Sequence, residues 1–169
     1  MNDSASSWYV LHSRPRQETR AVEHLTRQGY HIYYPTIQVR KKRRGKVVEV
    51  TEALFPRYLF IELGTQDNWT SVRSTRGVAD FVRFGGVPAR VPEALIDEIR
   101  LRLGDKQTSE RLSNLPKAGD RVRLRAGQFA DIEGILAETD GEKRCIVLIE
   151  LLGRTHKIES SFDELEKPD

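Results

Sequence analysis

The densest apolar and aromatic run of the chain extends from Leu54 to Leu63, and its composition predicts a strand. Alternation along a strand places the aromatic side chains after the proline on one face, namely Tyr58 and Phe60. It places the aliphatic ones on the other face, namely Leu59, Ile61 and Leu63. The aromatic face, which Phe55 extends, must be covered either within the chain or by a partner. A strand buried on both faces and a binding face are therefore both open.

The charge is unevenly distributed along the 169 residues, which suffice for one domain or two small ones. Residues 1–116 carry 19 Lys and Arg against 13 Asp and Glu, a net charge of +6. Residues 117–169 carry 9 against 12, a net charge of −3. This asymmetry indicates two modules that can attract each other, with a polyanion as the natural partner of the basic one.

The first module is expected to be α+β. Strands are predicted at 8–12, 30–39, 47–50, 54–63 and 79–84, and helices at 16–28, 65–74 and 92–103. This order gives an antiparallel-rich sheet with packed helices over residues 1–103. The polar, broken segment 104–116 is expected to be a linker.

Two clusters of polar and basic residues are candidate binding elements of this module. Six cations lie between Arg40 and Lys46 beside Gly45, which predicts a protruding hairpin whose partner is a phosphate backbone, or a loop that only aids solubility. A second group begins at Arg14 and continues on one face of the helix 16–28 with Gln17, Arg20 and His24. The alternative for that face is simple solvation.

The second module, 117–169, has two consistent interpretations. Glycines at 119, 127, 141 and 153 divide it into short segments typical of a small β-barrel. Alternatively, one helical face is formed by Phe129, Ile132, Ile135 and Leu136. A capping box from Thr139 to Glu142 would then open a second helix that ends at Gly153. In isolation the module is expected to prefer the barrel, because Gly134 disfavours a helix and the β-branched residues favour strands.

Several classes of protein are disfavoured. Cys145 is the single cysteine and lies in an apolar run, so it is expected to be a small buried side chain. The four histidines show no metal-ligand spacing, and no nucleophile and base pair is apparent. The N-terminus lacks the features of a signal peptide, and no apolar run has the length of a membrane span. We therefore expect a cytoplasmic, monomeric binding protein, with no cofactor, no metal and no enzymatic activity.

The chain resembles the NusG family of transcription elongation factors, most closely its specialised antitermination members. The segments that carry the resemblance in the first module are 8–11, 23–28, 44–46, 52–60 and 75–85. In the second module, segments 119–122 and 127–131 look like a KOW motif. A single KOW motif is weakly specific, but its combination with the first module in this order is strongly specific.

The resemblance implies an N-terminal domain that docks on the clamp helices of RNA polymerase and suppresses pausing and termination without covalent chemistry. The positions that match the polymerase-docking surface are Phe55, Tyr58, Phe60, Phe84 and Ile96. The positions that match, or lie beside, contacts with the displaced non-template DNA strand are Arg14, Gln17, Arg20, His24, Arg73, Thr75 and Arg76. Glu52 and Arg144 stand where specialised members join their two domains by a salt bridge. If the second module rests as a helical hairpin, it could bury Ile132, Leu136 and Leu148 against the aromatic surface.

Two functions within the family are open, together with one outside it. The first is an antiterminator that a DNA pause element recruits. The second is a housekeeping factor without element specificity, whose C-terminal domain recruits Rho or the ribosome. The segment 153–155 looks closer to the housekeeping barrel. The third is a KOW-containing RNA-binding or ribosomal module, for which the aromatic surface would have no purpose.

Overall fold

The computed structural model describes residues 6–103 and 131–166. The expected linker 104–116, Phe129 and most of the KOW-like segments lie outside the described residues. The domain boundaries at 103/104 and 116/117 therefore stay predictions.

The main sheet is antiparallel and has β1 at its centre. Its path is β2 (His31–Tyr33), β5 (Tyr58–Leu63), β1 (Ser7–Ser13) and β6 (Val78–Phe81), and β9 (Arg90–Val91) also pairs with β1. The register places Trp8 opposite Glu62 and Leu11 opposite Leu59. The sheet thus presents one aliphatic and one aromatic face of β5, as the alternation predicts.

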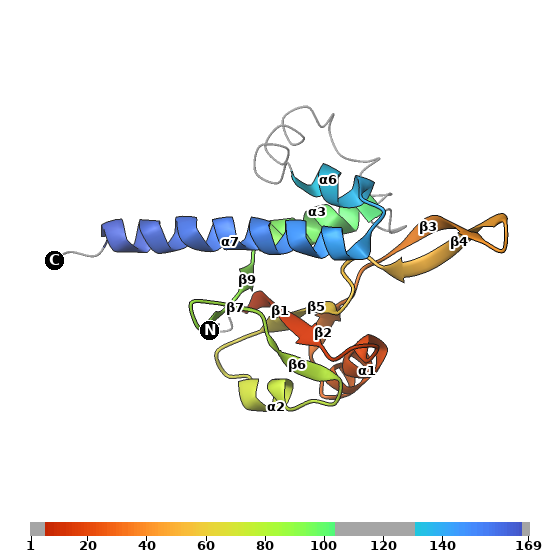
Figure 1. The fold of residues 1–169 in the computed structure, drawn as a ribbon. Coiled ribbons are helices and arrows are strands. Elements are labelled where there is room, and N and C mark those ends of the chain that lie inside the picture. The colour runs from red at the N-terminus through yellow and green to blue at the C-terminus, as the bar shows by residue number, and fades with distance from the viewer. Residues whose placement is uncertain (1–5, 104–130, 167–169) are drawn as a thin grey trace, which may run out of the picture.

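Helices cover both faces of this sheet (Figure 1). On the aliphatic side, α1 (Glu18–Arg27) and α2 (Trp69–Arg73) pack against Leu59, Ile61 and Leu63. On the aromatic side lie α3 (Glu93–Leu103), α6 (Asp131–Ala137) and the long α7 (Gly141–Glu166). The expected α+β architecture of the first module is confirmed. The hydrophobic core on the aromatic side of the sheet also includes residues from the C-terminal part of the chain.

Glycines set one helix end and one tight turn in this part of the chain. Gly29, with φ of 93°, follows α1 where a stop signal is predicted. Arg44 and Gly45, at φ of 52° and 78°, join β3 (Thr36–Arg43) to β4 (Lys46–Ala53). Two successive left-handed residues are typical of a tight hairpin turn, so the predicted basic hairpin is confirmed. We call this projecting pair of strands, residues 36–53, the basic ribbon (Figure 1).

Three of the predicted strands are shortened or divided in the structure. β5 begins at Tyr58 and not at Leu54, because Arg57 adopts a left-handed φ of 73° and the preceding residues form a turn. Leu54 and Phe55 are nevertheless fully buried in that turn. The segment 30–39 is divided at Pro35 into β2 and β3, since a proline cannot donate to a ladder. The segment 79–84 is also divided, because β7 (Arg83–Phe84) pairs with β8 (Val87–Pro88) through the Gly85 and Gly86 turn.

The described C-terminal part consists of two helices joined by the short connection 138–140. α6 and α7 correspond to the helical interpretation of the second module, and no described residue between 131 and 166 forms a strand. One detail of that interpretation is wrong: α7 does not end at Gly153 but continues to Glu166. A Cβ atom added at Gly153 would stand 3.6 Å from the Phe84 ring. The helix therefore passes directly over this aromatic side chain.

Candidate binding surfaces

The five candidate polymerase-docking residues come together in one cluster, which we call the aromatic patch. Its members are Phe55, Tyr58, Phe60, Phe84 and Ile96. Phe55 meets Phe60 edge to face, with ring centroids 5.9 Å apart, and Phe60 is also stacked on Tyr33 at 6.1 Å. Phe55, Phe60 and Ile96 are at most 1% exposed, whereas Tyr58 and Phe84 are half-buried. The patch is therefore covered.

The cover consists of α6 and α7. The sequence predicted contacts of the patch with Ile132 and Leu148, and both side chains are fully buried in the same cluster. Leu136 is only partly buried at its edge. Sequence reasoning did not assign this role to the other buried members, which are Ile135, Cys145, Leu151 and Leu152. The spacing of Leu148, Leu151 and Leu152 is a helical stripe that could have identified them.

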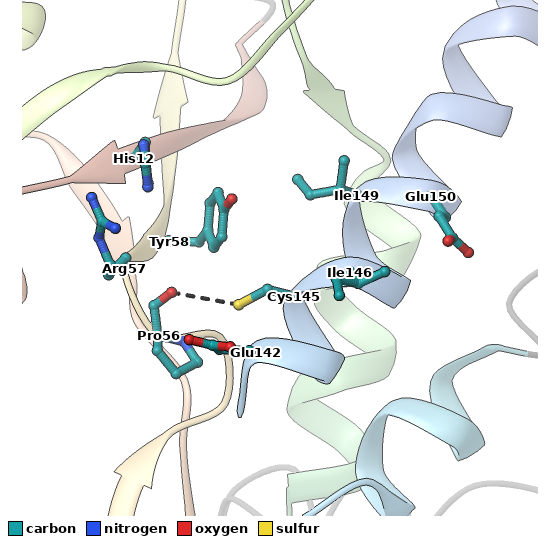
Figure 2. Close-up of a pocket in the computed structure, with 9 residues that line it drawn as sticks. All are labelled: His12, Pro56, Arg57, Tyr58, Glu142, Cys145, Ile146, Ile149 and Glu150. Atoms are coloured by element: carbon teal, nitrogen blue, oxygen red, sulfur yellow. Dashed lines mark hydrogen bonds between the residues drawn. The ribbon is translucent and has the colours of Figure 1, made fainter. Parts of the chain in front are cut away.

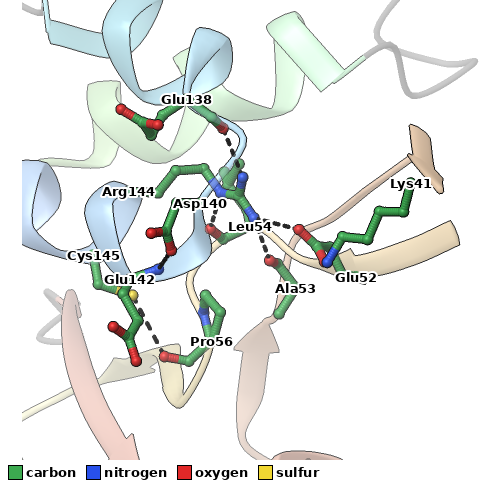
Figure 3. A network of polar contacts seen from close by, with 10 residues as sticks. All are labelled: Lys41, Glu52, Ala53, Leu54, Pro56, Glu138, Asp140, Glu142, Arg144 and Cys145. Atoms are coloured by element: carbon green, nitrogen blue, oxygen red, sulfur yellow. Dashed lines mark hydrogen bonds and ion pairs between the residues drawn. The ribbon is translucent and has the colours of Figure 1, made fainter. Parts of the chain in front are cut away.

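Arg144 fastens the start of α7 to the end of the basic ribbon (Figure 3). Its side chain is completely buried and donates through Nη2 to Glu52 Oε1 at 2.9 Å. It also donates to the carbonyl oxygens of Leu54 at 2.6 Å, Glu138 at 2.7 Å and Ala53 at 3.2 Å. A buried guanidinium is tolerated only when its donors are used in this way. The pair between Glu52 and Arg144 that the resemblance implies is thus present in the structure.

A second ionic contact joins α3 to α6. Arg102 donates to Glu98 at 2.7 Å within α3, and its other end pairs with Glu133 of α6. Glu98 is buried at 4% exposure, which makes it unusual for a carboxylate. Sequence reasoning did not identify this contact, because it depends on where α6 lies.

A cavity of about 490 Å³ lies beside the patch, between α7 and the turn before β5 (Figure 2). Tyr58 is stacked on His12 in its wall, with centroids 5.0 Å apart. Burial, and then the positive charge of Arg57, lower the pKa of His12. The Cys145 thiol donates to the Pro56 carbonyl oxygen at 3.4 Å, and burial raises the pKa of Cys145 to about 12. The prediction of a buried cysteine is confirmed.

The candidate DNA-binding residues lie on α1 and the turn before it, and on the last residue of α2 and the loop that follows. The exposed members are Arg14, Arg20, Arg73 and Arg76, while Gln17 and His24 are half-buried. Arg20 donates to Gln17 at 3.3 Å along the helix. The structure therefore displays four guanidinium groups of this set to solvent, and we call the whole set the basic face.

Thr75 differs from the other members of the basic face because it is buried at 8% exposure. Its hydroxyl donates to the Ser71 carbonyl at 2.8 Å and accepts from Gln28 Nε2 at 2.8 Å. Gln28 also accepts from the Ser71 hydroxyl at 2.7 Å. Gln28, which sequence reasoning did not single out, thus ties the end of α1 to α2 and the loop.

Gly77 allows this loop to lie directly on α1. It has a left-handed φ of 91°, and a Cβ there would stand 2.8 Å from both the Gln17 carbonyl oxygen and the Ala21 nitrogen. Its own carbonyl accepts from the Arg14 backbone at 2.8 Å. Only glycine fits this close approach, and it places Arg76 beside the first turn of α1. The signal was present in the sequence as a glycine directly after Arg76, but its packing role was not predicted.

These surfaces are suited to binding. Within residues 6–103 and 131–166, no group of three or more His, Cys, Asp or Glu side chains could hold a metal ion. Among the described helices, none combines the length and the apolar character needed to cross a membrane. What the geometry offers is a covered aromatic patch on one side and a basic face on the other.

The comparisons with known proteins agree with a binding protein. A family model described as "Transcription termination factor nusG" matches residues 6–100. The chain belongs to the NusG family of transcription termination and antitermination factors, and it is not an enzyme.

Curated relatives match along nearly the full length. The "Transcription termination/antitermination protein NusG" of Staphylococcus carnosus (strain TM300) is 29% identical over 175 aligned residues, which cover 96% of each chain. The protein of the same name from Staphylococcus aureus (strain Mu50 / ATCC 700699) is 28% identical with the same coverage. A solved structure described as "Domain interaction in Thermotoga maritima NusG" aligns with 59% of this chain and 57% of that chain, at 27% identity and a TM-score of 0.39.

Proposed function

We propose that this chain is a specialised antitermination factor that is held inactive by its own C-terminal helices until it is recruited. In this proposal the aromatic patch docks on the clamp helices of RNA polymerase, and the basic face binds the non-template DNA strand at a pause element. The bound factor then suppresses pausing and termination. The resemblance to the specialised paralogue RfaH supports this assignment, because Glu52 and Arg144 stand where RfaH joins its two domains.

The burial of the aromatic patch is the observation that carries the proposal. Phe55, Phe60 and Ile96 have almost no exposed surface beneath α6 and α7. Large aromatic side chains supply much of the affinity of protein interfaces, but only when a partner can reach them. A general factor that must bind every polymerase gains nothing from this cover. A factor that acts only at selected sites does gain, because the cover prevents binding elsewhere.

The sequence of the C-terminal helices favours their release from the aromatic patch. Gly134 and Gly153 both lie inside helices, where glycine costs about 1 kcal/mol each relative to alanine. The contacts with the aromatic patch offset this cost only while the helices are docked. Released, residues 117–169 are expected to form the small β-barrel that their alternating pattern also permits. Such a barrel would turn Leu148 inward and leave the patch bare.

The DNA part of the proposal rests on the basic face. Exposed arginines can pair with phosphates or with base edges, and His24 can hydrogen-bond a base that is turned out of its strand. The face lies on α1 with the turn before it, and on the end of α2 with the loop after it, on the opposite side of the sheet from α6 and α7 (Figure 1). It is therefore accessible in the closed form, so a DNA element can be recognised before the patch is uncovered.

Transcription on matched templates tests the proposal. Templates with and without a candidate pause element are transcribed with the factor at increasing concentration, and readthrough at a downstream terminator is scored. We expect readthrough to depend on the element and on its presence in the non-template strand. Equal activity on both templates would reject element-specific recruitment.

The alternative is a housekeeping factor that recruits Rho or the ribosome through its C-terminal domain. The observation in its favour is that the curated relatives that match 96% of this chain are named as NusG itself. Under this alternative the factor binds polymerase on every template, and the C-terminal segment binds Rho or a ribosomal protein. Pull-down of either partner by the full chain in the absence of any DNA element would favour the alternative.

A further inference from the structure

Glu52 is shared by two cations that come from different parts of the chain (Figure 3). Its Oε1 accepts from Arg144 of α7 at 2.9 Å, and its Oε2 pairs with Lys41 at 2.9 Å. Arg144 is completely buried, whereas the Lys41 side chain is 45% exposed. Both contacts lower the pKa of Glu52, and the hydrogen bond from Lys41 is the largest cause. Each carboxylate oxygen of Glu52 therefore has a cationic partner in the closed form.

The two cations differ in what happens to them when the helices leave. Lys41 is on β3 and Glu52 is on β4, the two paired strands of the basic ribbon. Glu52 pairs with Ile37, and Lys41 lies four residues further along β3, so alternation places Lys41 and Glu52 on the same face. Arg144 departs with α7, but Lys41 stays beside the carboxylate. Glu52 thus keeps a partner in the open form.

Two cations that share one carboxylate also repel each other. In the closed form Lys41 reduces the net attraction between Glu52 and Arg144, because like charges around a single acceptor oppose one another. In the open form Lys41 is relieved of that repulsion. Its presence therefore favours the open form relative to the closed one, even though it pairs with Glu52 in both.

We propose that Lys41 is a substitute partner for Glu52, which lowers the cost of releasing Arg144 and keeps the interdomain contact easy to reverse. This inference rests on the closed and open forms of the proposed function. A closed form fastened by a buried ion pair is costly to open, because loss of one partner leaves the other charge unpaired. Because Lys41 lies on the same ribbon as Glu52, the carboxylate is not left unpaired when Arg144 departs.

The test uses the full chain and the reactivity of Cys145, the single cysteine, towards N-ethylmaleimide. Because Cys145 lies on α7 and its thiol is buried against Pro56 in the turn before β5, its labelling rate reports how often the helices leave. Lys41→Met, which keeps the aliphatic stem, should slow labelling by about two- to fivefold, the range of a partly exposed ion pair. Lys42→Met is the matched control, since it removes the neighbouring charge on the opposite face of the ribbon and should leave the rate unchanged.

A double variant distinguishes competition for Glu52 from a general effect of charge. In a Glu52→Gln background, Lys41→Met should no longer slow labelling, because there is no carboxylate to share. Unchanged or faster labelling in the single Lys41→Met variant would overturn the inference, and so would an equal effect of Lys42→Met. Wild-type labelling as fast as that of a free thiol would instead reject the closed form itself, and with it both the proposed function and this inference.

Discussion

Arg144 and Glu52 are separated by 92 residues in the chain and are joined by a hydrogen-bonded ion pair of 2.9 Å. Arg144 has no exposed surface, so it cannot form this contact unless α7 is docked. The pair connects the end of the basic ribbon to the start of the helix that covers the aromatic patch. It is the natural place to change the balance between closed and open forms.

Replacement of Glu52 by glutamine should open the protein. Arg144 would retain its three carbonyl acceptors but lose the carboxylate of Glu52, and hydrogen bonds to charged groups are worth about 1.5–3 kcal/mol. We expect apparent polymerase affinity to rise by about ten- to 150-fold if the wild type is mostly closed. Glu49→Gln, at an exposed position of the same strand, is the control. Unchanged affinity in Glu52→Gln would show that this pair does not govern access to the patch.

Two glycine substitutions should have opposite effects on the closed form. At Gly134 an added Cβ meets nothing within 4 Å, so Gly134→Ala should favour the helical state by about 1 kcal/mol. At Gly141 the same group would stand 2.6 Å from Cγ of Pro56, so Gly141→Ala should push the start of α7 away. The Cys145 labelling rate should fall for the first variant and rise for the second. If both variants change it in the same direction, the packing of α7 on Pro56 is not what holds the helix in place.

Alkaline pH should weaken the closed form through Cys145. Burial raises the pKa of this thiol from an ordinary value of 9.0 to about 12, so its contribution is complete below pH 9 and is lost as the pH rises towards 12. Helix content and patch exposure, followed from pH 8 upward, should show opening in this range. Cys145→Ala removes the ionisable group and should make that part of the transition disappear. Burial also raises the pKa of the Tyr58 hydroxyl, which lines the same cavity, so any alkaline transition that remains in the variant is assigned to Tyr58.

Loss of a guanidinium from the basic face should weaken DNA loading and spare polymerase binding. Arg20 and Arg76 are both exposed and take no part in the two hydrophobic clusters. Arg20 lies on α1, on the opposite side of the sheet from the helices that cover the patch. Arg20→Ala and Arg76→Ala should therefore reduce recruitment to the pause element at physiological salt, while affinity for polymerase without the element stays the same. Normal loading of both variants would remove the basic face from the DNA interface.

Much of the first module was predictable because local and long-range preferences agree there. The alternation in β5, the helical stripe of α1 and the stop at Gly29 each appear in the structure as expected. The errors arise where the backbone conformation of one residue decides the boundary. Arg57 takes a left-handed φ that no local pattern indicates, and it delays the start of β5.

The second module could not be decided from its own residues. Its sequence satisfies both the helical and the strand periodicity, so the choice depends on what lies against it. The patch residues Phe60 and Ile96 supply that surface, and α7 continues past Gly153 because Phe84 packs beneath it. The contact between Arg102 and Glu133 could not be predicted for the same reason, since it forms only when α3 and α6 are packed together.

The most direct test of the central claim is backbone NMR of the free full chain beside the isolated segment 117–169. The account predicts helical chemical shifts for residues 141–158 in the full chain and strand shifts for the same residues in the isolated segment. In the full chain, the helical shifts should give way to strand shifts when the ion pair with Arg144 is removed by Glu52→Gln. Identical strand shifts in the free full chain and in the isolated segment would contradict the covered patch and leave an ordinary barrel beside an open docking surface.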